Sequence, residues 1–295
     1  MTSVPAGPGR VTPAKAIGWS IAFLVLTFLA AGFITMGAGA LLTGSLDRTV
    51  EWLKAFSAGT IMIQAIAALT STALFTWLIG FRRLGLSRAD LRYAGWSAAS
   101  PGLRWGLMAG GLTAGLALLI AVVAGQARWV KDAGDVGEYI MQALKTVALL
   151  APAALSEELI FRGVPLVLLA AALGRGSAVV ATSLVFALAH ISNPNATPLG
   201  LGNIALAGIF LGLTFYAPGG IWTAFGAHWG WNSVLACLDT PVSGLPFRIP
   251  MLDYNAGAPG WLTGGTFGPE GGLAATLALT IAIVVTARLI ARAPS

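Results

Sequence analysis

The chain has 295 residues, of which 57% are hydrophobic and only 9% are charged. Soluble domains carry about 25% charged residues, so the composition excludes an ordinary soluble protein and predicts an integral membrane protein. The formal net charge is +6, but the basic residues gather between apolar runs and form no basic stripe interleaved with aromatics. That distribution is typical of topology signals, and no nucleic-acid partner is expected.

Apolar stretches of about 20 residues are long enough to cross a bilayer. The sequence contains eight candidates, so we expect an all-α, polytopic integral membrane protein with about eight transmembrane helices. We expect residues 1–295 to form a single membrane domain, with a polar N-terminus at 1–16 and a bend near Pro165. The candidate spans are 17–42, 57–81, 103–125, 139–171, 177–192, 200–217, 219–239 and 271–291.

Lysine and arginine counts orient these spans. The connection 82–104 carries five arginines, and both ends of the chain carry Lys or Arg. Eight crossings place these three regions on one side of the membrane, which the positive-inside rule identifies as cytoplasmic. We therefore expect both termini to be cytoplasmic.

Two further patterns concern packing. Glycines recur at small-xxx-small spacing, for example at Gly106/Gly110 and Gly226/Gly230, which predicts close helix approach. The Pro- and Gly-rich stretch 240–270 is expected to be a surface loop anchored by its aromatic residues. A lid over the site is the alternative interpretation.

Only two histidines occur in the chain, His190 and His228, and both lie in apolar stretches. Ionisable residues inside a membrane are functional candidates by default. On a helix, His228 and Asn232 share one face and would point together at one spot, as donors to an oxyanion do. Phe186 and His190 share another face, which would place an aromatic wall beside the second imidazole.

A pair of acidic residues precedes the histidines. Arg162 lies one helical turn beyond Glu158, so these two side chains can pair, while Glu157 faces elsewhere. This leaves Glu157 available as a general base. The alternative is a purely structural trio that joins helices by ion pairs.

Together these residues resemble the CAAX protease and bacteriocin-processing family, the Abi or type II CAAX prenyl endopeptidase group of intramembrane proteases. Three motifs carry the resemblance, in the family's order: Glu157-Glu158-x-x-x-Arg162, Phe186-x-x-x-His190 and His228-x-x-x-Asn232. The resemblance implies a catalytic core at about 139–239. In it, Glu157 and His190 would activate a water, and His228 and Asn232 would stabilise the oxyanion. Supporting roles would fall to Glu158, Arg162 and Phe186.

The resemblance leaves the cofactor open. The family is commonly named as metalloproteases, although a Glu-dependent mechanism without metal is also argued for it. We expect no required cofactor. Zinc is the alternative, held by Glu157, His190 and His228 with water as the fourth ligand, but Asn232 suits an oxyanion better than zinc.

The resemblance also indicates the partners. The expected substrate is a membrane-associated or lipidated peptide or protein, cleaved near the cytoplasmic side among membrane lipids, in a bacterial inner or plasma membrane. One alternative is a non-catalytic family member that acts as a membrane scaffold or bacteriocin-immunity protein. Another is a transporter that uses Glu157 and the histidines as a proton relay.

Overall fold

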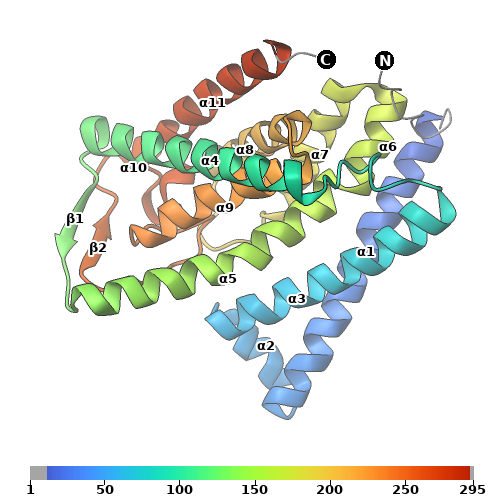
Figure 1. The fold of residues 1–295 in the computed structure, drawn as a ribbon. Helices are drawn as coiled ribbons and strands as arrows, with labels where there is room; N and C mark the ends of the chain where they lie inside the picture. Colours follow the sequence, from blue (N-terminus) through green and yellow to red (C-terminus); the bar gives the residue numbers. More distant parts are fainter. Residues whose placement is uncertain (1–11, 293–295) are drawn as a thin grey trace. The chain divides into compact units, whose positions relative to one another are not determined.

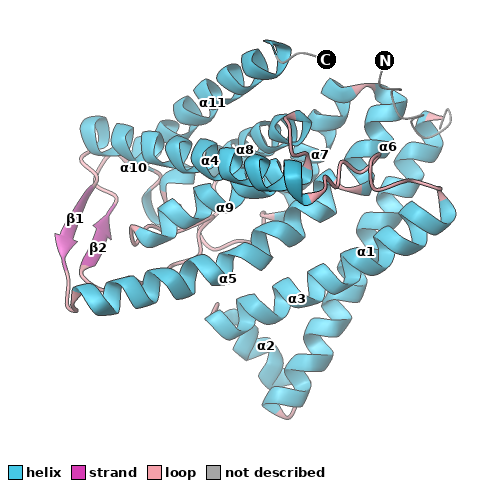
Figure 2. Ribbon diagram, viewed as in Figure 1, coloured by secondary structure: helices cyan, strands magenta, loops and turns pink. Residues whose placement is uncertain are grey.

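The computed structural model describes residues 12–292, and this range is mostly helical (Figure 2). Residues 1–11 of the expected polar N-terminus lie outside it. The helices are α1 (Pro13–Thr43), α2 (Leu46–Lys54), α3 (Ala58–Phe75), the π-helix η1 (Thr76–Arg83), α4 (Trp96–Gly125), α5 (Val136–Arg162), α6 (Val164–Leu173), α7 (Arg175–Ala189), α8 (Pro198–Tyr216), α9 (Ile221–Cys237), α10 (Gly260–Thr263), the 3-10 turns η2 (Gly265–Phe267) and η3 (Pro269–Gly271), and α11 (Leu273–Arg292). The strands are β1 (Arg128–Lys131) and β2 (Leu252–Asn255).

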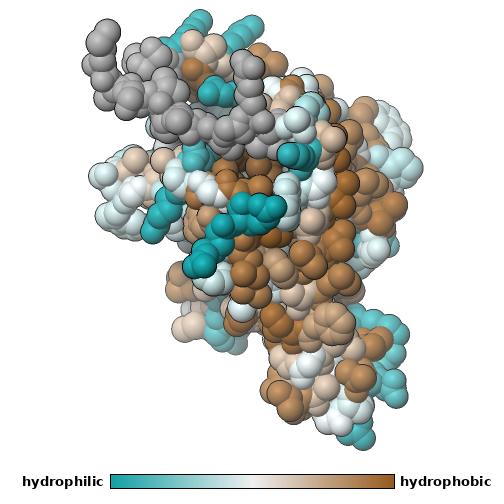
Figure 3. Space-filling model, turned by 90° about the vertical axis from the view of Figure 1, so that its right-hand side faces the viewer, coloured by the Kyte–Doolittle hydropathy of each residue, from teal (hydrophilic) through white to brown (hydrophobic). Residues whose placement is uncertain are grey.

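Among the described residues, five helices are long and apolar enough to cross a membrane: α1, α3 continued through η1, α4, α8 and α11. The all-α membrane fold is confirmed, but the count of eight crossings is not. The apolar helix α7 has 15 residues and the helix α9 has 17, short of the roughly 20 residues that span a bilayer. Large hydrophobic side chains such as Leu41 and Phe33 are exposed, and Figure 3 shows hydrophobic residues over much of one face.

A helix break lies at Gly163, two residues before the bend expected at Pro165. The expected span 139–171 is two helices, because α5 ends at Arg162 and α6 begins at Val164. Pro165 lies in the first turn of α6, where its missing N–H costs no helical hydrogen bond.

The chain divides into two compact units. The first comprises residues 1–94 and 151–179, and the second comprises 95–150 and 180–295. In the first unit, α1 packs against α3 and α6, around buried side chains that include Phe23, Leu91 and Leu168. The expectation of one membrane domain stays a prediction.

In the second unit, α4 and α9 lie side by side (Figure 1). A Cβ atom added to Gly110 would collide with the backbone of Ala227, and one added to Gly230 would collide with the backbone of Leu107. Gly106 and Gly226 meet the opposite helix in the same way. The predicted close approach at small-xxx-small spacing is therefore confirmed, and it fixes α9 against α4.

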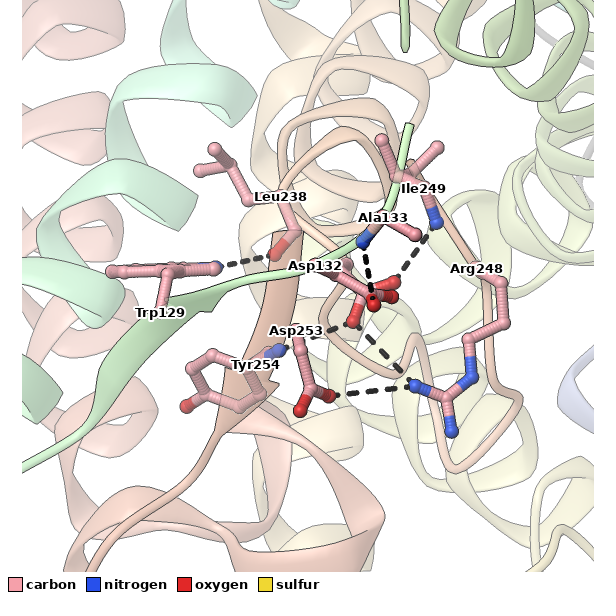
Figure 4. Close-up of polar contacts among 9 residues, drawn as sticks. Trp129, Asp132, Ala133, Leu238, Arg248, Ile249, Asp253 and Tyr254 are labelled. Carbon is pink, nitrogen blue, oxygen red and sulfur yellow. Dashed lines mark hydrogen bonds and ion pairs between the residues drawn. The ribbon is translucent and has the colours of Figure 1, made fainter. Parts of the chain in front are cut away.

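A two-stranded sheet and the buried carboxylate of Asp239 hold part of the stretch 240–270 in place. Strands β1 and β2 pair antiparallel, and the indole of Trp129 donates to the Leu238 carbonyl at 2.6 Å. Asp239 accepts from the backbone N–H groups of Ile249 and Tyr254 at 2.9 and 3.1 Å. We call these five residues the sheet cluster (Figure 4). Residues 249–255 are thus held against strand β1, which precedes α5, and against Asp239, which follows α9.

Candidate active site

The acidic pair lies near the C-terminal end of α5, in the first unit. Glu158 and Arg162 form an ion pair at 3.1 Å, one helical turn apart, and both side chains are buried. The predicted pairing is confirmed. Glu157 is half-buried and points about 100° away from Glu158 around the helix, so its carboxylate faces a different direction.

The second motif surrounds the end of α7. His190 follows the last residue of α7, and its Nδ1 lies 2.8 Å from the Phe186 carbonyl oxygen. Because a carbonyl oxygen only accepts, this contact places the proton on Nδ1 and makes Nε2 the basic nitrogen of the neutral ring. The backbone of α7 thereby selects the tautomer that a general base needs.

Phe186 contacts both imidazoles. Its ring centre lies 4.7 Å from that of His190 and 5.9 Å from that of His228, edge-on to the latter. The aromatic wall expected beside His190 is present, and it also lies beside His228.

The third motif lies on α9. His228 and Asn232 are one turn apart on this helix and line the same cavity. The indole of Trp229 donates to the Val147 carbonyl at 2.9 Å, and Gly226 and Gly230 pack on α4. These contacts set the rotation of α9 and hold the His228 and Asn232 side chains toward the cavity.

The cavity itself is small. Its polar lining consists of His190, His228, Trp231, Asn232, Ser243 and Glu270, and apolar side chains such as Phe186 complete the wall. The space open to the centre of a water molecule is about 20 Å³, and roughly 10–15 Å³ by this measure holds one water. Two imidazoles and an amide therefore surround room for a single water or a single substrate atom.

Glu270 is a cavity residue that the sequence analysis did not select. It is 4% exposed, and its Oε1 accepts from the Trp231 indole at 3.1 Å. Burial raises the pKa of the Glu270 carboxyl, while hydrogen bonds from Ser243 and Trp231 and the nearby His190 act in the opposite direction. One signal was available in the sequence, since Glu270 is the only glutamate after Glu158.

The structure brings His190, His228 and Asn232 together around one cavity, with Phe186 beside them. Glu157, Glu158 and Arg162 belong to the first unit, and the joint action of Glu157 with the histidines stays a prediction. Within residues 12–292, no three side chains of His, Cys, Asp or Glu are placed to hold a metal ion. The zinc set of Glu157, His190 and His228 stays a prediction, because Glu157 belongs to the first unit and both histidines belong to the second.

A comparison with protein-family models finds a match to the type II CAAX prenyl endopeptidase Rce1-like family over residues 139–234. No curated protein and no solved structure matches the chain. The matched segment contains all three motifs, from Glu157 to Asn232, and it ends before Ser243 and Glu270. The match supports the assignment of residues 139–234 to the type II CAAX prenyl endopeptidase Rce1-like family.

Proposed function

We propose that the protein is an intramembrane endopeptidase that hydrolyses a peptide bond in a membrane-associated or lipidated peptide or protein. The observation that carries the proposal is the cavity, where His190, His228 and Asn232 surround space for one water. The Rce1-like match supports protease chemistry in a membrane setting. Both termini would lie in the cytoplasm of a bacterial cell.

In the proposed reaction, Glu157 and the Nε2 atom of His190 activate a water molecule for attack on the scissile carbonyl carbon. The water gives its proton to the Glu157 carboxylate as the new C–O bond forms. The carbonyl oxygen becomes an oxyanion, which accepts hydrogen bonds from a ring N–H of His228 and from the Asn232 amide. Glu157 then passes the proton to the leaving amine as the C–N bond breaks.

The support for this division of roles is chemical. An imidazole and an amide one turn apart on α9 can donate to the same oxygen, and the packing of α9 on α4 keeps them in place. Donors that are already oriented need little reorganisation when charge develops, which is the source of most oxyanion stabilisation.

The test is cleavage of a fluorogenic prenylated CAAX-type peptide by purified protein in lipid, comparing wild type with Glu157→Gln. A general base contributes about 10²- to 10⁴-fold, so the variant is expected to lose at least about 100-fold in kcat while remaining folded. Glu51→Gln is the matched control, because Glu51 lies on α2 in the first unit and its ion pair with Lys54 is exposed. Turnover by Glu157→Gln at the wild-type rate would remove Glu157 from the reaction.

Two measurements accompany this assay. A chelator and a metal-content analysis test zinc, because a metal-dependent enzyme would lose turnover on chelation and regain it with added zinc. Tight peptide binding without turnover in the wild-type protein would instead identify a scaffold or immunity protein.

A further inference from the structure

Glu270 is held on several sides. Its Oε2 accepts from the backbone N–H of Ser243, and its Oε1 accepts from the Trp231 indole at 3.1 Å and from the Ser243 hydroxyl at 3.4 Å. The Asn203 amide donates to the Glu270 carbonyl at 2.8 Å and to the Gly272 carbonyl at 2.9 Å. Both the side chain and the backbone of Glu270 are thus fixed to α8, to α9 and to the segment after α9.

This arrangement leaves acceptor capacity in the cavity. A carboxylate offers about four acceptor positions, and the three donors from Trp231 and Ser243 occupy three of them. A buried carboxylate is costly unless hydrogen bonds satisfy it. Glu270 lines the cavity that His190, His228 and Asn232 also line, and this cavity has room for about one water.

We propose that the remaining acceptor position of Glu270 binds the water molecule of this cavity and orients it for attack. The catalytic consequence rests on the proposed endopeptidase function, whereas the water site itself does not. A water that donates one hydrogen bond to Glu270 keeps its other proton for the basic pair of Glu157 and His190, and this arrangement directs a lone pair toward the scissile carbonyl carbon. Because Glu270 already accepts three hydrogen bonds, it orients the water and the base takes the proton.

The chain provides a matched control for this role. Asp239 is also a buried carboxylate, 6% exposed, and it also accepts backbone N–H groups from the 240–270 stretch. Unlike Glu270, it does not line the cavity. Asp239→Asn and Glu270→Gln each replace one carboxylate oxygen with an NH₂ group, so their folding defects should be similar and only Glu270→Gln should impair the water.

The experiment combines kinetics with a high-resolution structure, using the full chain in lipid. Glu270→Gln is expected to lower kcat on the order of 100-fold, the scale for misplacing a reacting group, with KM within a few-fold of wild type. Asp239→Asn should keep the wild-type kcat per folded molecule. The wild-type structure should show a water within hydrogen-bonding distance of Glu270, and the Glu270→Gln structure should show that water displaced or lost.

A second variant guards against a folding failure. Glu270→Asp keeps the charge and moves the carboxylate back by one methylene group, so it should fold and lose less kcat than Glu270→Gln. Equal kcat in wild type and Glu270→Gln would overturn the proposal, as would a wild-type cavity with no water at Glu270. An inactive wild-type protein with a water bound at Glu270 would contradict the endopeptidase function but support the water site.

Discussion

Two regions of the second unit each contain a buried carboxylate, and they differ in what surrounds it. In the sheet cluster, the buried Asp239 accepts two backbone N–H groups, and Arg248, which is 80% exposed, lies 3.8 Å away. Around the cavity, the buried Glu270 accepts from Ser243 and Trp231. Both carboxylates hold the same stretch of chain in place.

The difference lies in what faces each carboxylate. Asp239 contacts the backbone of the loop and of strand β2, whereas Glu270 lines a cavity that two imidazoles and an amide also line. A buried carboxylate is therefore not by itself a mark of function. What distinguishes Glu270 is the polar cavity that it lines.

The largest effect on stability is expected at Glu158. It is a third buried carboxylate, and its expected role is purely structural. Breaking a buried ion pair costs about 3–5 kcal/mol, and the Glu158 and Arg162 side chains are both buried. We expect Glu158→Gln to lower the free energy of unfolding by the lower end of that range, measured by denaturant titration in detergent. Glu51→Gln breaks an exposed pair and serves as the control, because exposed pairs contribute little.

A smaller effect is expected at the oxyanion donors. There the loss is in stabilisation of the transition state and leaves the stability of the fold unchanged. His228→Ala and Asn232→Ala should each lower kcat by about 10²- to 10³-fold, the effect of removing one such donor. Their unfolding transitions should stay close to that of wild type. Normal turnover by either variant would show that the substituted side chain takes no part in catalysis. The cavity would then have only a structural role, like the sheet cluster.

Asp239→Asn tests the other side of the comparison. The substitution sets an NH₂ group against a backbone N–H, and leaving a buried polar group unsatisfied costs about 1–3 kcal/mol. We expect a loss of stability in that range without change in kcat per folded molecule, measured by thermal unfolding and by the peptide assay. A loss of kcat larger than the loss of folded protein would show that the sheet cluster affects the geometry of the cavity.

The two regions also differ in how far the sequence predicts them. The His228–Asn232 and Glu158–Arg162 pairs, and the glycines between α4 and α9, follow from helical spacing, which fixes neighbours one turn apart whatever the fold. The contacts of Glu270 and Asp239 join residues far apart in the sequence, within a stretch that has no periodic pattern. The Trp129–Leu238 contact spans more than a hundred residues, and no local signal encodes it.

The crossing count illustrates the same limit. Hydrophobic length alone gave eight spans, but helix ends depend on tertiary packing and on breaks such as the one at Gly163 between α5 and α6. Similarly, the motifs predicted the side chains at the cavity wall. They did not predict that Ser243 and Glu270, beyond the family-matched segment, complete it.

The smallest effect is expected at Trp129. A substitution there tests a single hydrogen bond of the sheet cluster. Trp129→Phe removes the 2.6 Å bond to the Leu238 carbonyl and keeps an aromatic ring beside Tyr254, whose ring centre lies 5.4 Å from that of Trp129. A single hydrogen bond contributes about 1 kcal/mol, so thermal unfolding should shift slightly and kcat should not change. A loss of stability as large as that of Asp239→Asn would mean that the indole bond and the carboxylate act as one cooperative unit. In that case the double variant would be no less stable than either single variant, because neighbouring groups in one network do not add independently.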